Sequence, residues 1–269
     1  MTGTPPVALT IAGSDSGGGA GIAADLRTFA AHGVFGALAI TAITAQDTVG
    51  VRSVQAVSPE MVTAQIEAVC DDLRPMAAKT GMLASPEIVK AVAALAASGL
   101  LPPLVVDPVL VASSGDPLFD GIEVRDAYRE LVSLAGVVTP NLPEASLLVG
   151  RPIGDVEEME SAARELQSSG PFLVVVKGGH LSGAEAIDVA FDGHDVTLLR
   201  APWVDTGNVH GTGCSFSAAI AAELALGREP LEAAQRAKMY VHRAIGLGAT
   251  WHLGSGHGPI DHMGAARGP

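Results

Sequence analysis

Short apolar runs alternate with longer Ala- and Leu-rich stretches along this chain. Runs with the length and composition of buried strands occupy residues 7–12, 38–42, 104–106, 137–139 and 172–176. The stretches between and after them predict helices at residues 22–31, 59–73, 86–97, 157–168, 214–226 and 230–247. This alternation is typical of βαβ units, in which helices cover both faces of a parallel sheet and the strands are apolar throughout. We therefore expect an α/β fold with a mostly parallel central sheet.

Residues 184–199 differ from this pattern. They contain two β-type runs separated by Asp192-Gly193, a dipeptide that favours the tight turn of a hairpin. We expect an antiparallel hairpin at the edge of the sheet. The Gly-rich segment 254–259, G-S-G-H-G-P, predicts a surface loop.

Polar groups follow the predicted strands. They are Gly13-Ser14-Asp15 after the first run, Asp107-Pro108 after residues 104–106, Pro140-Asn141 with Glu144 after 137–139, and Lys177-Gly178-Gly179 after 172–176. The carboxyl ends of parallel strands meet at one edge of a sheet, where ligands bind. We therefore expect these groups to converge in space.

Residues 205–223 combine a glycine-rich turn with a helix of small apolar residues. Gly207, Gly211 and Gly213 precede the helix, whose unpaired amide groups and dipole would hold an anion. This is no Walker A loop, because the Lys of that motif is missing. Cys214 stands at the helix start, where the thiol pKa can fall to roughly 3.5–7.5, so it would serve as a base or nucleophile. A Gly-rich turn capping a core helix around a structural Cys is the alternative.

The other candidates each have a structural alternative. Residues 13–21 do not match G-x-G-x-x-G, so a small-ligand loop is favoured over a dinucleotide site. Asp25 would reach a substrate amine or hydroxyl, or be a solvated helical Asp. His210 fits a loop hydrogen-bonder better than a base, and His180 is either a ligand contact or a turn residue.

Lys177 and an Asn/Glu pair complete the set. Lys177 would offer its charge to a phosphate, or lie at the surface. Asn141 and Glu144 would share a helical face and hold Mg²⁺ through waters, or cap a helix, and Asp107 has the same ambiguity. A Lys, carboxylates and a glycine anion hole at one edge are what phosphoryl transfer needs.

Composition limits the partners. The 269 residues are 48% hydrophobic and 17% charged, which suits one domain over 1–269 with flexible ends near 1–5 and 263–269. A net charge of −13 argues against nucleic acid or an anionic membrane as partner. Two cysteines form no disulfide framework, the start lacks signal-peptide character, and no apolar run is long enough to span a membrane. We expect a cytoplasmic protein that binds small molecules.

Seven segments, in order, closely resemble the hydroxymethylpyrimidine kinase/phosphomethylpyrimidine kinase family, the thiamine-biosynthesis branch of the ribokinase superfamily. They are A-G-S-D-S-G-G-G-A-G-I-A-A-D-L-R-T-F at 12–29, I-T-A-I-T-A-Q-D-T-V-G-V at 40–51, K-T-G-M-L at 79–83, V-D-P-V-L-V-A at 106–112, T-P-N-L-P-E-A at 139–145, V-K-G-G-H at 176–180 and H-G-T-G-C-S at 210–215. The resemblance covers roughly residues 5–262. It implies a ribokinase-like three-layer α/β/α fold, a homodimer, and two ATP-dependent phosphorylations. These convert 4-amino-5-hydroxymethyl-2-methylpyrimidine (HMP) to its monophosphate and then to the diphosphate.

The resemblance also implies roles for individual residues. The pyrimidine would be held by Gly13, Asp25, Gln46, Met82 and Val109. A Gln side chain offers an acceptor and donors, as an aminopyrimidine edge requires. Mg²⁺ would be organised by Asn141, Glu144 and Asp107, and ATP by Lys177, Thr206, Gly211, Thr212, Gly213 and Lys238. The catalytic set would be Cys214, Gly211, Gly213 and Asp107, with the Cys214 thiolate accepting the hydroxymethyl proton while amides of the 211–214 turn stabilise the transferring phosphoryl group.

Some positions depart from the family pattern. Ser113 stands where Lys or Thr is common, Gly207 where a basic residue is frequent, Val209 replaces Thr, and Ala23 replaces Gln. Lost positive charge would weaken phosphate binding, so the second phosphorylation is less secure than the first. The nearest alternative is a pyridoxal/pyridoxine kinase of the same superfamily, against which Gln46 favours the aminopyrimidine. A thiol hydrolase using Cys214 and His210, and a sensor that binds pyrimidine without turnover, are more distant alternatives.

Overall fold

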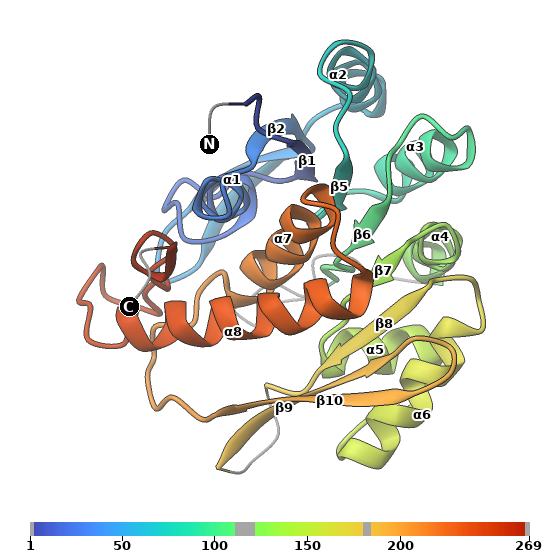
Figure 1. The fold of residues 1–269 in the computed structure, drawn as a ribbon. Helices are drawn as coiled ribbons and strands as arrows, with labels where there is room; N and C mark the ends of the chain where they lie inside the picture. Colours follow the sequence, from blue (N-terminus) through green and yellow to red (C-terminus); the bar gives the residue numbers. More distant parts are fainter. Residues whose placement is uncertain (1–2, 111–121, 180–183, 267–269) are drawn as a thin grey trace.

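The computed structural model describes residues 3–110, 122–179 and 184–266. Its main sheet has eight strands in the order β10-β9-β8-β7-β6-β5-β1-β2 (Figure 1). The strands are β1 (Val7–Ala12), β2 (Phe35–Ile40), β5 (Ala77–Thr80), β6 (Leu104–Val106), β7 (Val137–Val138), β8 (Leu173–Lys177), β9 (Glu185–Phe191) and β10 (Val196–Pro202). Pairs from β2 through β8 are parallel, whereas β9 and β10 are antiparallel to their neighbours. The mostly parallel sheet predicted from the hydrophobic pattern is confirmed.

Helices cover both faces of this sheet (Figure 1). One layer contains α1 (Gly21–Ala31), α7 (Thr212–Ala225) and α8 (Pro230–Gly248). The other contains α2 (Pro59–Asp72), α3 (Pro86–Ala97), α4 (Ile122–Ser133), α5 (Leu142–Val149) and α6 (Val156–Gln167). Successive strand residues face opposite layers, since Ala8 packs with α7 and α8 while Leu9 packs with α2 and α3. This gives the predicted three-layer α/β/α arrangement.

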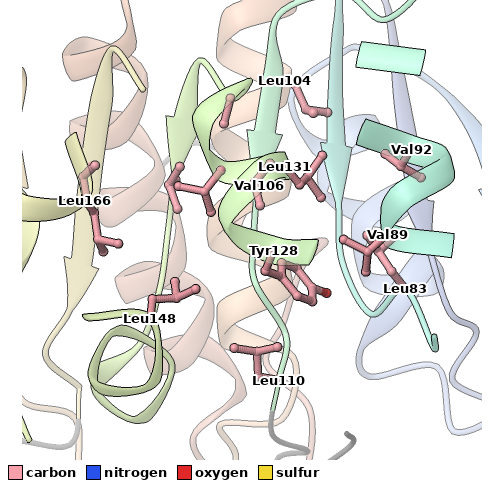
Figure 2. Close-up of a cluster of buried hydrophobic side chains, with 14 of the residues drawn as sticks. Leu83, Val89, Val92, Leu104, Val106, Leu110, Tyr128, Leu131, Leu148 and Leu166 are labelled. Atoms are coloured by element: carbon pink, nitrogen blue, oxygen red, sulfur yellow. The ribbon is translucent and has the colours of Figure 1, made fainter. Parts of the chain in front are cut away.

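Both layers mix large and small buried side chains, but helix α7 is unusually rich in buried alanine. Figure 2 shows Tyr128 of α4 beside Leu131 and Leu110, in the core that also holds Leu83 and Val89. The opposite layer contains α7, where Ala218, Ala219, Ala221 and Ala222 are fully buried. Alanine has a high helix propensity and a short side chain, so α7 can lie close to the sheet, α1 and α8 at once. This packing brings the first turn of α7 to the carboxyl edge of the strands.

Most predicted elements are present within two residues of their expected bounds, and the 184–199 hairpin is confirmed as β9–β10 at the sheet edge. The prediction of one strand at 38–42 is wrong. The chain leaves the main sheet at Thr41 and forms β3 (Ala42–Gln46), which pairs only with β4 (Val51–Ala56) in a separate antiparallel sheet. An apolar run cannot show where a strand changes partner. Strand β5 was not predicted either, because Lys79 interrupts its short apolar pattern.

The carboxyl-terminal loop is exposed from His252 to His257, as predicted, but then returns to the protein. Gly258 accepts a hydrogen bond from the His210 amide, and Pro259 bridges to His210. Gly264–Ala266 form a short 3-10 turn against α8, so this part of the predicted flexible end has a defined structure. Within the described ranges, no helix has the length and apolar character needed to cross a bilayer.

Candidate active site

Two glycine-rich loops meet at the carboxyl edge of the sheet, residues 13–21 after β1 and residues 207–213 before α7. Gly211 has a φ of 82°, and a Cβ there would lie 1.9 Å from the carbonyl oxygen of Gly19. A Cβ at Gly19 would lie 2.5 Å from a ring carbon of His210. The loops are therefore in backbone contact, which requires glycine at both positions.

Asp15 and His210 join the two loops. The His210 Nε2 lies 2.9 Å from Asp15 Oδ2, and the Asp15 carboxylate also accepts hydrogen bonds from the amides of Gly17, Gly19 and Ala20. Burial alone would raise the pKa of Asp15, but hydrogen bonds from His210 and the backbone outweigh it and lower that pKa. The expectation that His210 is a hydrogen-bonding loop residue is confirmed. Its Nε2 is committed to Asp15, which gives no support to a role as base for Cys214.

The start of α7 and Lys177 form a positive site. Gly211 is the N-cap of α7 and has no side chain to bond the first amides. The Thr212 amide donates to Val209 O at 3.2 Å, so the amides of Gly213 and Cys214 are the ones that can bind a ligand. A Cβ on Gly213 would lie 3.3 Å from Lys177 Nζ, which places the ammonium group beside the helix start. The Lys177 side chain is 15% exposed, so the surface-Lys alternative is wrong. Helix dipole and ammonium group together favour an anion such as phosphate.

Asp107 holds Lys177 in this position. Lys177 Nζ donates to Asp107 Oδ1 at 2.8 Å, and the same carboxylate accepts from Thr139 Oγ1 at 3.3 Å and Ser217 Oγ at 3.1 Å. Burial would lower the pKa of Lys177, but Asp107 and Glu144 more than offset it and raise that pKa. Lys177 therefore keeps its positive charge. The convergence predicted from the strand ends is confirmed for Asp107, Asn141 and Lys177.

Asn141 and Glu144 form a capping box on α5. Glu144 N donates to Asn141 Oδ1 at 2.9 Å, and Asn141 N donates to Glu144 Oε2 at 2.8 Å. Burial raises the pKa of Glu144 to about 8, Lys177 opposes this rise, and Asp107 adds to it. The capping alternative is confirmed. Among the described residues no three His, Cys, Asp or Glu side chains form a metal cluster. Two carboxylates with an amide oxygen nevertheless suit Mg²⁺, which usually keeps water and phosphate ligands.

Asp25 is fully buried, so the solvated-Asp alternative is wrong. Its oxygens accept hydrogen bonds from Lys79 Nζ at 3.0 and 2.9 Å, and from Thr10 Oγ1 at 2.6 Å. Lys79 is also fully buried, and sequence reasoning assigned it no role. The only signal was a Lys inside the motif K-T-G-M-L, at the end of an Ala-rich segment.

The expected low pKa of Cys214 is wrong. Burial raises the pKa of the Cys214 thiol to about 11, although part of the residue remains accessible. Lys79 opposes this rise, whereas Asp25 and Asp107 add to it. Removal from water outweighs the helix field here, because a thiolate loses its hydration on burial.

Among the predicted pyrimidine residues, Gly13, Met82 and Gln46 lie at the 13–21 loop. Gly13 N donates to Met82 O at 3.1 Å, and a Cβ on Gly13 would lie 2.4 Å from Met82 Cε. The backbone of Gln46 is held by Ser16 Oγ, at 2.6 Å and 2.8 Å. Val109 N donates to Asp107 O at 2.9 Å. These contacts bring the residues to the same edge, and their contact with substrate stays a prediction.

The remaining predicted ATP residues are engaged within the protein. Thr206 Oγ1 donates to Ala249 O at 3.1 Å, and Thr212 Oγ1 donates to Val209 O at 2.6 Å. Lys238 Nζ donates to Asp188 Oδ2 at 2.7 Å, while Asp188 Oδ1 accepts from Gly178 N. Asp188 thus links Lys238 to the loop that follows Lys177. Ser113 and His180 lie outside the described residues.

His262 supports α7 from the carboxyl-terminal segment, a residue that sequence reasoning missed. Its Nε2 lies 2.8 Å from Ser215 Oγ, and its carbonyl accepts from Tyr240 Oη at 3.1 Å. Burial lowers the pKa of His262 from its usual 6.5 to about 4. The residue stays neutral in the folded protein and becomes protonated more readily when unfolded.

We expect His262 to make stability depend on pH. Between about pH 6.5 and pH 4 the unfolded chain binds the extra proton, so folding stability falls as pH falls. From about pH 7 to about pH 5 the loss attributable to His262 is about 2 kcal/mol. His262→Gln keeps a donor for Ser215 and removes this contribution. Urea unfolding of both proteins at the two pH values measures it, and equal losses in both would contradict the assignment.

Comparison with known proteins identifies the family. Residues 15–261 match the family model described as phosphomethylpyrimidine kinase. The hydroxymethylpyrimidine/phosphomethylpyrimidine kinase of Rhizobium meliloti (strain 1021) is 52% identical over 259 residues, which cover 96% of this chain and 97% of that protein. This chain belongs to the phosphomethylpyrimidine kinase family. The segments 12–29 and 210–215 quoted above contain the two glycine-rich loops of the candidate site.

Solved structures of two activities resemble this phosphomethylpyrimidine kinase family member. The phosphomethylpyrimidine kinase of Clostridium difficile 630 matches with a TM-score of 0.79 and 41% identity, covering 89% of this chain and 99% of that one. The pyridoxal kinase of Staphylococcus aureus, in complex with AMP-PCP and pyridoxal, matches with a TM-score of 0.88 and 35% identity, covering 97% and 94%. The fold is therefore shared by kinases of both substrate classes.

Proposed function

We propose that this protein phosphorylates HMP and then its monophosphate with ATP, producing the pyrimidine diphosphate for thiamine biosynthesis. The observation that carries the proposal is the meeting of Lys177, Gly213 and Cys214 at the start of α7. This places an anion site, a fixed positive charge and a proton acceptor together. Membership of the phosphomethylpyrimidine kinase family supports the choice of substrate.

Each group has a part in phosphoryl transfer. The amides of Gly213 and Cys214 and the Lys177 ammonium bind the ATP phosphates and stabilise charge on the transferring group. Thr206, Thr212 and Lys238 lie on the side of the site that binds ATP. Asp107, Asn141 and Glu144 would hold Mg²⁺, which would neutralise phosphate charge. Gly13, Asp25, Gln46, Met82 and Val109 orient the pyrimidine with its hydroxymethyl group toward Cys214.

Cys214 acts as the base. Its thiolate takes the hydroxymethyl proton while that oxygen bonds to the γ-phosphorus and the bond to the ADP oxygen breaks. Because the thiol pKa is about 11, the thiolate is a minor form near neutral pH but a strong base. We expect the reaction to become faster as pH rises.

The second candidate is a pyridoxal kinase. The observation that favours it is the likeness to the Staphylococcus aureus pyridoxal kinase over nearly the whole chain. The test measures the rate of ADP release from Mg-ATP with each of four acceptors: HMP, HMP monophosphate, pyridoxal and pyridoxine. A reaction without acceptor is the blank. We expect turnover with both pyrimidines and little with the pyridine rings. Turnover with pyridoxal but not the monophosphate would support the second candidate, and no turnover with any acceptor would refute kinase function.

We further propose one kinase domain, a cytoplasmic location and a homodimer. The dimer is supported by the small sheet β3–β4, in which every residue of β4 is exposed, including Val51 and Val54, as is Ile43 on β3. Exposed apolar side chains gathered in one region of a surface are typical of an interface. Sedimentation at micromolar concentration would show a monomer if this is wrong.

A further inference from the structure

Lys79 and Asp25 form a buried ion pair that the roles described above leave unexplained. Both side chains have no exposure to solvent. Lys79 Nζ bonds both Asp25 oxygens, and a Cβ on Gly81 would lie 3.0 Å from it. Removing two charges from water costs several kcal/mol for each ion, and an apolar pair is often as stable. Stability alone is therefore a poor reason for this pair.

The pair lies on two elements that pack against α7, the helix whose first turn carries Cys214. Strand β5 carries Lys79 and helix α1 carries Asp25, and both contact α7. The starts of α1 and α7 are adjacent, because a Cβ on Gly211 would lie 1.9 Å from Gly19 O. The Lys79 charge acts directly on the Cys214 thiol, and Lys79 itself senses Asp25, Cys214 and Asp107. The charged groups whose field acts on the Cys214 sulfur are Lys79 on β5, Asp25 on α1, Asp107 after β6 and Lys177 on β8.

We propose that Lys79 is a positioning residue for phosphoryl transfer, whose ammonium group, fixed by Asp25, stabilises the thiolate form of Cys214. Its importance in catalysis rests on the proposed function, but its effect on the sulfur is a property of the free protein. Asp25 has two opposing effects. It keeps Lys79 protonated and in place, and its own negative charge disfavours a second anion nearby.

This balance predicts opposite outcomes for two nearly isosteric substitutions. Lys79→Met removes the stabilising cation, so Cys214 becomes harder to ionise. Asp25→Asn removes a competing anion and leaves the thiolate as the partner of Lys79, so Cys214 becomes easier to ionise. A nearby charge moves a pKa by about 1–3 units, and lower thiolate nucleophilicity offsets part of the change. We expect alkylation to be about 3- to 40-fold slower in Lys79→Met and faster by a similar factor in Asp25→Asn.

The experiment measures iodoacetamide alkylation of the full chain without substrate, at a fixed pH near 8.5, by peptide mass spectrometry. This method separates Cys214 from Cys70, which lies on α2 and is an internal control for global loosening. The alkylation rate of Cys70 should be unchanged in both variants. Circular dichroism shows that each variant is folded.

Opposite shifts at Cys214 with a constant Cys70 rate support the proposal. Equal rates, or shifts in the same direction, overturn it, because a loosened core would accelerate both variants. If Lys79→Met does not fold, Asp25→Asn decides, since an unchanged or slower rate refutes the proposal. Because no substrate is present, these outcomes are independent of ADP release. If no acceptor gave ADP release, the proposed function would be refuted, and the effect of Lys79 and Asp25 on Cys214 alkylation would still be measurable.

Discussion

Replacing Cys214 by Ala should lower kcat by about 10²–10⁴-fold, the usual contribution of a general base. The substitution removes the proton acceptor and leaves the α7 amides and Lys177 in place, so the KM for ATP should change little. The remaining activity should come from positioning and charge stabilisation alone.

The pH profile makes this prediction specific. With a thiol pKa of about 11, the thiolate fraction grows as pH rises through the neutral range, so wild-type kcat should increase by up to about tenfold per pH unit. The increase should disappear in Cys214→Ala. Cys70→Ala is the matched control, because Cys70 lies on α2 against the opposite core, and its turnover should match wild type. A steep profile that persists in Cys214→Ala would exclude Cys214 as the base.

Gly211→Ala should lower kcat/KM by at least about 10²-fold, as expected when a reacting group moves by about 1 Å. A Cβ at this position would lie 1.9 Å from Gly19 O, so the two glycine loops must separate. The separation moves the first amides of α7 away from the phosphate site. The separation also strains the Asp15–His210 hydrogen bond. We expect the free energy of unfolding to fall by about 3 kcal/mol or more.

Gly227→Ala provides the matched control. Gly227 has a φ of 80°, nearly that of Gly211, but no atom lies within 4 Å of its Cβ position. Gly227 therefore has the same left-handed conformation without a close neighbour. Its substitution by Ala should lower the free energy of unfolding by only about 1–2 kcal/mol and leave turnover normal. Steady-state kinetics and urea unfolding of both variants test the comparison. Equal losses of turnover in the two would show that backbone conformation, and not loop contact, is responsible.

Local patterns in the sequence were sufficient for the architecture. Apolar runs at strand spacing, separated by helical stretches, predict a parallel sheet, and the carboxyl ends of parallel strands share an edge. For this reason Asp107, Asn141 and Lys177 could be placed near one another before any coordinates. The capping box of Asn141 and Glu144 was also readable, because both partners lie within one helical turn.

Short-range periodicity in the sequence was enough for the fold class and for the edge at which the site forms. The partner of Asp25, the support of α7 by His262 and the direction of the Cys214 pKa depend on contacts between segments that are distant in sequence. The helix start predicts a field that lowers this pKa, and that field is local. Desolvation and the charges of Lys79, Asp25 and Asp107 come from segments distant in sequence, and their sum reverses the local effect.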